Sequence, residues 1–373
     1  MEIPRAEITR IESGTLEGRR PRNVGCNACK QAHGDRVFDP IVRIDTDRGV
    51  NGFGWSRLSE SVARSFLGRT IDSLFALPSG SRPEARALDF PLWDLVGKLM
   101  ERPVYELLGG SSGSVPVYDS SIYIDDLDCS NDDYAINLIL REIDAGLFNG
   151  HRSFKMKVGR GFMWMPHDEG IRRDIALIRA VRKRVDRDVN IMIDANNGYS
   201  LNDVKHVFEE VGDCDIYWME EPFPENAYLL RLLKDHFAEM RVETRISDGE
   251  GNAPSSFLEL VESGLVDIVQ YDMRSFGFSA WLELASRIDE WGGLCAPHCW
   301  GSLIDTFHQA HFARGISNFC YIECDTMRMV GLASDGYVIR DGYLNVSDAP
   351  GFGLGLDGAI FGRAVGSGGF SVS

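Results

Sequence analysis

From about residue 114 onward, short apolar segments alternate with longer amphipathic ones. The short segments are bounded by Gly, Pro, Asn or Asp, which is typical of β-strands. Eight such segments are predicted strands: residues 114–121, 152–159, 189–196, 215–222, 244–250, 266–272, 293–299 and 319–325. Between them, Ile171, Ile175 and Ile178 recur at helical spacing, and residues 202–211 carry a similar stripe. Strands that alternate with helices indicate parallel βαβ units, and eight units indicate a closed (β/α)8 barrel of the TIM type.

The first part of the chain lacks this alternation. Two strand-like segments come first and two helical patterns follow, at residues 7–18, 38–49, 58–67 and 87–100. We therefore expect an α+β domain over residues 1–113, followed by the barrel over residues 114–329. Residues 330–373 are rich in glycine and short strand-like pieces, and we expect this segment to pack back on the first domain.

The composition of the 373-residue chain is that of a soluble globular protein, with 44% hydrophobic and 25% charged residues. The formal net charge of −17 argues against nucleic acid and anionic membranes as partners, because both bind clustered Lys and Arg. No apolar run is long enough for a membrane span, and the N-terminal residues lack a secretory signal pattern. Eight cysteines without such a signal indicate reduced thiols and a cytoplasmic protein, with Cys26 and Cys29 as free thiols in a loop.

Seven of the eight predicted strands end in titratable residues, and chance rarely produces such a series. In chain order these residues are Lys155 and Lys157, Asp194, Glu220, Asp248 and Glu250, Asp272, His298 and Glu323. The active sites of (β/α)8 enzymes lie at the C-terminal ends of the strands. The sequence therefore predicts an active site at this end of the barrel.

Carboxylates stand at the ends of three adjacent strands. Asp194, Glu220 and one of the pair Asp248 and Glu250 offer hard oxygen ligands, which suit Mg2+. A single carboxylate at a strand–helix junction often interacts only with the start of the following helix. Three in succession favour a metal site instead.

The remaining groups predict acid–base chemistry. Lys155 and Lys157 alternate on one strand, so both point into the barrel, where each is expected to lower the pKa of the other. His298 can pair with Asp272, which leaves its second ring nitrogen to transfer a proton. A metal-bound carboxylate that loses its α-proton becomes an enediolate. The second group then returns a proton, giving racemisation or epimerisation, or protonates a leaving hydroxyl, giving dehydration.

The ordered motifs resemble the enolase superfamily, in particular its mandelate racemase subgroup, which includes muconate lactonizing enzymes. The motifs are FKMKVG, MIDANNGYS, WMEEP, SDGEG, VQYD and APHCWGS at successive strands, together with residues 87–110 and 342–357. The resemblance covers nearly the whole chain. It implies a (β/α)8 barrel with an N-terminal α+β capping domain completed by the C-terminal tail, and a Mg2+-stabilised enediolate.

The resemblance also implies roles for individual residues. They are Lys157 as a base tuned by Lys155, Asp194, Glu220 and Glu250 as Mg2+ ligands, Asn196 at the metal or substrate, His298 with Asp272 as the opposing acid or base, and Glu323 at the substrate carboxylate. Asp248 remains a rival of Glu250, because 30 residues separate Glu220 from Glu250 whereas 26 separate Asp194 from Glu220.

Two loops are expected at the barrel mouth. The candidate substrate contacts are Asn27, Lys30 and His33 in the capping-domain loop at residues 14–34, and Trp164 in the loop at residues 159–170. The second loop is longer than a strand–helix connection requires. It is either a lid or substrate wall, or it packs against the capping domain or a neighbouring subunit.

The favoured function is a Mg2+-dependent lyase that dehydrates an acid sugar, an aldonate or aldarate, to a 2-keto-3-deoxy acid. The alternative is a racemase or epimerase of a 2-hydroxy acid with the same Lys157 and His298. A third alternative is a non-catalytic, metabolite-binding barrel. His308 and His311 lie at helical spacing away from the strand ends, and we expect a packed helix face rather than a metal site. The resemblance further suggests a homo-oligomer.

Overall fold

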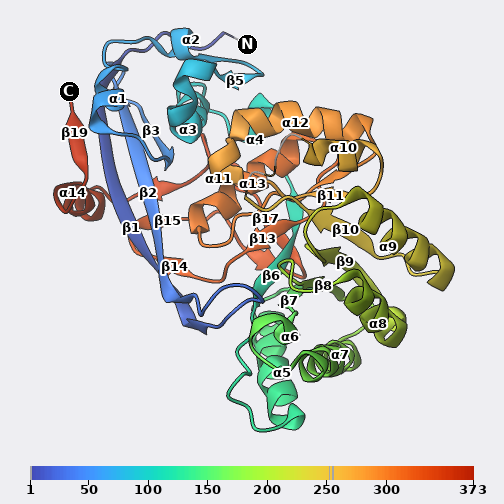
Figure 1. Cartoon of the computed structure of the whole chain (residues 1–373). Helices are drawn as coiled ribbons and strands as arrows, with labels where there is room; N and C mark the ends of the chain where they lie inside the picture. The colour runs from blue at the N-terminus through green and yellow to red at the C-terminus, as the bar shows by residue number, and fades with distance from the viewer. Residues whose placement is uncertain (1, 252, 254–255) are drawn as a thin grey trace.

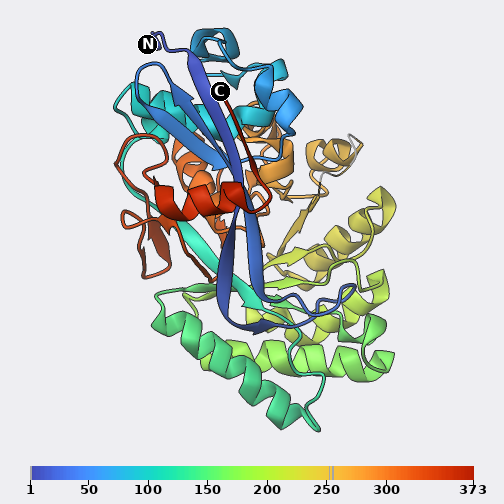
Figure 2. The same cartoon turned by 90° about the vertical axis from the view of Figure 1, so that its left-hand side faces the viewer.

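The computed structural model describes residues 2–251, 253 and 256–373. In Figure 1 a barrel of strands and helices lies beside a sheet built on the long strands β1 (Ile8–Val24) and β2 (Gly34–Thr46). Both chain ends lie on the side of this sheet (Figure 2). The α+β capping domain therefore lies beside the barrel, as the sequence predicts.

Eight parallel strands form the barrel. They are β6 (Ser114–Ile122), β7 (Ser153–Lys157), β8 (Asn190–Asp194), β9 (Ile216–Glu220), β10 (Arg245–Asp248), β11 (Ile268–Val269), β12 (Leu294–Cys295) and β13 (Ile322–Cys324). From β6 to β12, neighbouring strands pair in chain order, and β13 pairs with β6. A parallel bridge between Cys295 and Phe319 closes the ring. All eight predicted strands are present, and the (β/α)8 prediction is confirmed.

Helices cover the outside of the barrel. They are α5 (Asp132–Phe148), α6 (Arg160–Met163), α7 (His167–Arg184), α8 (Leu201–Val211), η2 (Gly212–Cys214), α9 (Ala227–Met240), α10 (Phe257–Glu262), α11 (Met273–Phe276), α12 (Phe278–Glu290) and α13 (Leu303–Gly315). The predicted stripe lies on α7, where Ile171 and Ile178 are buried. Helix α8 begins with a capping box formed by Ser200 and Asp203, which satisfies N–H groups at the helix start.

Large side chains fill the barrel interior below the strand ends. Tyr118, Met192, Trp218 and Ile268 are fully buried in one cluster. Met192 and Trp218 lie two residues before Asp194 and Glu220, so the alternation of a strand directs all four side chains inward. Burial of each large apolar side chain contributes about 1.5–3 kcal/mol, which makes this layer a rigid floor for the site.

The capping domain is an antiparallel sheet with α3 (Asp89–Leu99) on the face of Gly52 and α14 (Gly358–Gly366) of the C-terminal segment on the opposite face. Its further elements are β3 (Asn51–Trp55), α1 (Glu60–Arg64), α2 (Ile71–Leu74), β4 (Phe75–Ala76), β5 (Gly80–Ser81), η1 (Pro83–Leu88) and α4 (Val104–Leu107). Helix α3 packs closely on β3 at Gly52, where a Cβ atom would lie 2.4 Å from the Leu95 nitrogen. Only glycine permits this approach of helix to strand.

The C-terminal segment contacts both parts of the molecule. It contains β14 (Arg328–Met329), β15 (Leu332–Ala333), β16 (Ile339–Arg340), β17 (Tyr343–Asn345), β18 (Gly355–Leu356), α14 (Gly358–Gly366) and β19 (Phe370–Val372). Strands β14 and β19 pair with β1, and α14 lies across the capping sheet (Figure 2). Strand β17 pairs with β6 of the barrel. The division at residues 113 and 329 stays a prediction.

Two further findings concern the cysteines and the possibility of a membrane span. All eight cysteines are free thiols. Within the described residues, the helices are too short or too polar to cross a membrane.

Candidate active site

The two lysines of β7 lie inside the barrel. Lys155 is 1% exposed, and its ammonium lies 2.6 Å from Glu220 Oε1 and 3.1 Å from Glu323 Oε1. Lys157, two residues further along β7 and closer to the mouth, forms an ion pair with Asp194. The alternation of the strand thus brings both lysines to the predicted carboxylates.

Three carboxylates form a compact cluster at the ends of β8, β9 and β10. One oxygen from each of Asp194, Glu220 and Glu250 lies within 4.8 Å of the others. Gly249 directs Glu250 to this cluster, because its backbone has a φ of +107° that a residue with a side chain rarely adopts. The sharp turn after β10 therefore completes the carboxylate set.

Asp248, the rival of Glu250, lies outside the cluster. It shares a face of β10 with Ile246, which packs in the core beneath the outer helices, whereas Ser247 between them is the partner of the inward-facing Glu220. Its Oδ1 accepts a hydrogen bond from the Gly249 nitrogen at 2.6 Å. Burial and the nearby Glu225 raise the pKa of Asp248 to about 8. The structure therefore places Glu250, and not Asp248, with Asp194 and Glu220.

The charges in the cluster fit a divalent cation. Burial and the neighbouring Asp194 raise the pKa of Glu220 to about 8, although Lys155 opposes them. Burial would also raise the pKa of Asp194, but Lys157 and Lys155 lower it to about 2. Close carboxylates repel each other, and Mg2+ bound between hard oxygens relieves that repulsion. The buried Asn196 Oδ1 near this cluster has no hydrogen-bond partner among the residues that the structure describes, and it offers one more oxygen.

The expected lowering of a lysine pKa does not occur in this arrangement. Burial lowers the pKa of Lys157, and so does Lys155, but Asp194 and Glu250 outweigh both and the pKa is raised. The pKa of Lys155 is likewise held above its ordinary value by Glu220 and Glu323, against burial. Lys155 thus lowers the pKa of Lys157 as predicted, but in the absence of the metal the surrounding carboxylates have the larger effect.

His298 and Asp272 form the predicted pair. His298 Nδ1 lies 2.5 Å from Asp272 Oδ1. The opposite nitrogen, Nε2, lies 3.8 Å from Glu250 and 3.7 Å from Glu323. Burial lowers the pKa of His298, but Glu250, Glu323 and Asp272 together raise it to about 9. The imidazole is therefore oriented by one carboxylate and carries its proton toward the cluster.

Glu323 lies at the bottom of the same space. Its Oε2 accepts hydrogen bonds from the backbone nitrogens of Cys299 at 2.7 Å and Trp300 at 2.9 Å. Burial raises the pKa of Glu323, but Lys155, His298 and the Cys299 N–H hold it far below its ordinary value. Glu323 is thus an acceptor that connects the lysine side of the site to the histidine side.

The capping-domain loop reaches the barrel mouth. In Figure 1 the connection after β1 extends from the capping sheet to the ends of the barrel strands, where Cys26 pairs with Ile124. Asn27 Oδ1 accepts hydrogen bonds from the backbone nitrogens of Cys29 at 2.9 Å and Lys30 at 2.7 Å, so it shapes the loop. The Lys30 ammonium lies 4.0 Å from Glu250.

The loop after β7 packs against this capping loop. Trp164 Nε1 donates a hydrogen bond of 2.7 Å to the backbone oxygen of Asn27. Arg160, at the start of α6, is fully buried between Asp126 and Asp174 and anchors the loop. The structure therefore shows the contact between this loop and the capping domain, which was one of the predicted alternatives.

Several residues at the site were not predicted from the sequence. Tyr123, the first residue after β6, is buried, and the Lys157 ammonium lies 5.1 Å from the centre of its ring. Trp300 stacks on Tyr123, with ring centres 4.7 Å apart. Glu221 accepts a hydrogen bond from Asn196 Nδ2 at 3.0 Å. The WMEEP and APHCWGS motifs contain two of these residues, but only the fold shows that they face the cluster.

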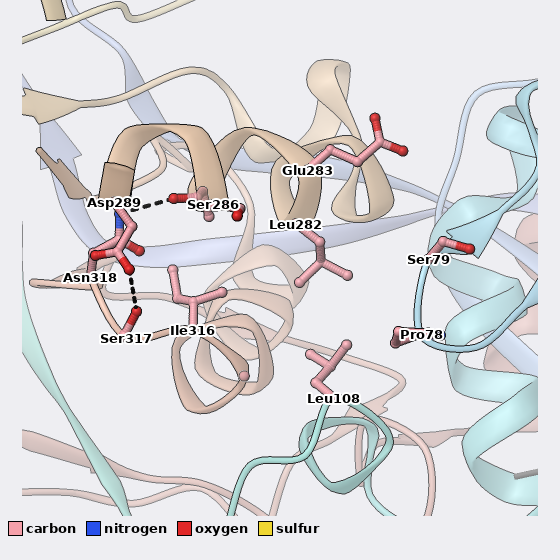
Figure 3. Close-up of a pocket in the computed structure, with 12 residues that line it drawn as sticks. Pro78, Ser79, Leu108, Leu282, Glu283, Ser286, Asp289, Ile316, Ser317 and Asn318 are labelled. Carbon is pink, nitrogen blue, oxygen red and sulfur yellow. Dashed lines mark hydrogen bonds between the residues drawn. The ribbon is translucent and has the colours of Figure 1, made fainter. Parts of the chain in front are cut away.

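The two histidines of α13 and a cavity along α12 lie outside the site. His308 and His311 are fully buried on α13, where they stack on Phe90 and Tyr105, so the predicted packed face is confirmed. A cavity of about 560 Å3 lies along α12 near Leu282 (Figure 3). None of the predicted site residues lines it.

Comparison with known proteins identifies the family of the chain. The enolase C-terminal domain-like family matches residues 139–360. Galacturonate dehydratase from Geobacillus sp., solved with D-galacturonate and 5-keto-4-deoxy-D-galacturonate, is 35% identical, with 100% of both chains covered and a TM-score of 0.96.

Two further relatives are similar to this chain over most of its length. A mandelate racemase/muconate lactonizing protein from Geobacillus sp. Y412MC10, solved with magnesium and tartrate, is 35% identical over 98% of this chain and 97% of its own, with a TM-score of 0.96. Arabinonate dehydratase from Saccharolobus solfataricus is 26% identical over 90% of this chain and 84% of its own. The predicted Mg2+ cofactor and acid-sugar dehydratase class are confirmed at this level. The chain belongs to the enolase superfamily, among the relatives of mandelate racemase that dehydrate acid sugars.

Proposed function

We propose that this protein dehydrates a hexuronate, such as D-galacturonate, to a keto-deoxy acid with the help of Mg2+. One observation carries the proposal: the carboxylate cluster lies between Lys157 on one side of the barrel and His298 on the other. Such a site can remove a proton next to a carboxylate and deliver another proton nearby. The similarity to galacturonate dehydratase over the whole chain supports a hexuronate as the substrate class.

The overall reaction removes one water molecule. The base takes the proton from the carbon next to the carboxylate. The C–O bond at the adjacent carbon breaks, and its electron pair leaves with the hydroxyl group, which takes a proton from the acid. The resulting enol tautomerises to the ketone. D-galacturonate and 5-keto-4-deoxy-D-galacturonate, the two ligands of the Geobacillus relative, differ by this loss of water.

Each residue has a role in this scheme. Asp194, Glu220 and Glu250 would hold Mg2+, which supplies positive charge to the substrate carboxylate when the α-proton leaves. Lys157 removes that proton once its ion pair with Asp194 is exchanged for the metal. Lys155 holds Glu220 and Glu323 in place from below.

His298 delivers the proton to the departing hydroxyl. Asp272 raises the pKa of His298 through their hydrogen bond, which favours the protonated ring, and it fixes the orientation of that ring. A protonated imidazole is the form required of a general acid. Asn196, whose Oδ1 is buried without a partner in the described part of the chain, would bind the metal or a substrate hydroxyl.

Racemisation or epimerisation of a 2-hydroxy acid is the second candidate. It is favoured by the same placement of Lys157 and His298 on opposite sides, because a proton removed on one face can be returned on the other. The two reactions share their first step and differ only in whether a hydroxyl leaves.

Proton NMR in D2O separates these reactions. The enzyme with Mg2+ is incubated with a panel of uronic, aldonic and aldaric acids, and a matched sample contains EDTA. We expect a new deoxy-methylene signal from a hexuronate, lost in EDTA. Exchange or inversion at the α-carbon without that signal supports the racemase alternative. A panel without any reaction contradicts both.

We also propose a cytoplasmic homo-oligomer, on the basis of the eight free thiols and the resemblance to the family. Light scattering after size-exclusion chromatography measures the oligomeric state. A mass of 41.6 kDa in solution would contradict the oligomer.

A further inference from the structure

An aromatic wall of Tyr123 and Trp300 stands beside the base Lys157. The two rings stack at 4.7 Å with an angle of 27°. The Lys157 ammonium lies 5.1 Å from the centre of the Tyr123 ring, so the wall begins next to the group that removes the proton. Trp300 also belongs to the turn whose backbone N–H binds Glu323. The two rings therefore lie next to both Lys157 and Glu323.

His33 of the capping-domain loop stands against this wall. Its ring meets Tyr123 edge-on at 4.9 Å and Trp300 at 6.4 Å. The His33 Nε2 is buried and has no hydrogen-bond partner among the described residues. Burial and the cations Lys157 and Arg20 lower the pKa of His33 to about 4, so the ring is neutral at neutral pH. A buried polar atom without a partner is costly, and a substrate hydroxyl would satisfy it.

The buried cation against this wall is already paired. Arg20 lies 4.5 Å from the centre of the Trp300 ring, but its guanidinium binds both oxygens of the buried Asp325, at 2.8 and 2.6 Å. The Lys30 side chain is 65% exposed, and its ammonium lies 4.0 Å from Glu250, so its charge is directed toward the carboxylate cluster. A second carboxylate on a substrate would meet aromatic faces and a neutral imidazole here, and a charge without a partner is strongly disfavoured.

We propose that Tyr123, Trp300 and His33 bind the end of the substrate remote from the metal, and that they select acid sugars in which this end is uncharged. The rings pack against the C–H face of the sugar chain, and His33 Nε2 forms a hydrogen bond with a hydroxyl. The enzyme then accepts a hexuronate and rejects the aldarate that differs only by a second carboxylate. This selection rests on the proposed dehydration and adds a rule for the substrate.

D-galacturonate and galactarate are the matched substrates for the test. Their hydroxyl stereochemistry is the same, and they differ at the remote end, which is an aldehyde or its hydrate in one and a carboxylate in the other. We expect kcat/KM of the Mg2+-loaded enzyme to be at least about 100-fold higher for D-galacturonate. Equal values, or a preference for galactarate, would overturn the selection rule while the dehydration itself stands.

Two variants test the wall directly. His33→Lys adds a cation beside the rings, and we expect the ratio of kcat/KM values to shift toward galactarate by about tenfold or more. Trp300→Leu removes the ring but keeps the backbone N–H that binds Glu323, so we expect KM for D-galacturonate to rise about tenfold with a smaller change in kcat. Trp300→Phe keeps a ring, so its KM for D-galacturonate should be close to the wild-type value. His206→Asn, an exposed histidine on α8, is the matched control and should leave both substrates unchanged.

The outcomes separate the two proposals. An unchanged ratio in His33→Lys, or a loss of kcat without a change of KM in Trp300→Leu, overturns the binding role of the wall. Failure of the wild-type enzyme to dehydrate either acid, with no deuterium incorporated at the α-carbon, overturns the proposed function. Dehydration of D-galacturonate with the expected ratio supports both.

Discussion

His298 Nε2 lies 3.8 Å from Glu250 Oε2, although the two residues follow different strands and are 48 positions apart in the chain. This contact sets the distance between the group that delivers a proton and the group that binds the metal. In the proposed reaction, Glu250 would be a ligand of the metal that binds the substrate carboxylate, and His298 would act on the carbon atoms next to it.

His298→Asn should abolish dehydration and preserve the fold. Loss of a general acid lowers kcat by about 100- to 10,000-fold, because the hydroxyl must then leave without its proton. The measurement is the steady-state rate with D-galacturonate, and the melting temperature and Mg2+ affinity should match the wild type. Full turnover by this variant would exclude His298 from the reaction.

Glu250→Gln and Asp248→Asn form a matched pair for the metal site. Glu250→Gln should raise the Kd of Mg2+ at least about tenfold, because the variant loses a charged ligand. Asp248→Asn should leave the affinity unchanged, since Asp248 faces away from the cluster. The readout is the rise in melting temperature with added Mg2+, since a ligand at about 100 times its Kd stabilises the folded state by about 2.7 kcal/mol. The opposite order of effects would restore Asp248 as the ligand.

Asp39→Asn should change how stability depends on pH. Burial and the nearby Asp305 raise the pKa of Asp39 from 3.8 to about 7. The folded state therefore holds this proton between about pH 4 and pH 7 while the unfolded state releases it, so the wild type loses stability as pH rises through that window, by up to about 1.4 kcal/mol per pH unit.

The asparagine variant has no such proton to lose. It keeps an oxygen that can accept the hydrogen bond from the Leu303 nitrogen. We therefore expect its melting temperature, relative to the wild type, to increase between pH 5 and pH 8. A constant difference across this range would show that Asp39 titrates normally.

Trp164→Phe tests the contact between the two mouth loops. The variant loses the hydrogen bond to the Asn27 oxygen but keeps an aromatic ring, so unfolding should become easier by about 1 kcal/mol. KM should rise a few-fold with kcat nearly unchanged, because the capping loop that carries His33 is less well held. Met163→Ala, at an exposed neighbouring position, should change neither quantity.

Much of the fold could be read from local patterns. Each barrel strand is a short apolar run whose buried positions are set by the chain itself, and Ser200 and Asp203 mark the start of a helix by their own hydrogen bonds. The residues of the carboxylate cluster could also be located, because every parallel strand of a barrel presents its C-terminal end at the same rim.

The sequence by itself determined which strand ends carry lysine, carboxylate and histidine, and therefore the class of chemistry. Only the tertiary structure decided between Glu250 and Asp248, because the choice depends on the turn at Gly249 and not on spacing. It also decided the direction of the Lys157 pKa, which depends on how many carboxylates surround the ammonium. Contacts between distant segments, such as Tyr123 with Trp300, leave no local periodicity in the chain, since packing in three dimensions alone brings them together.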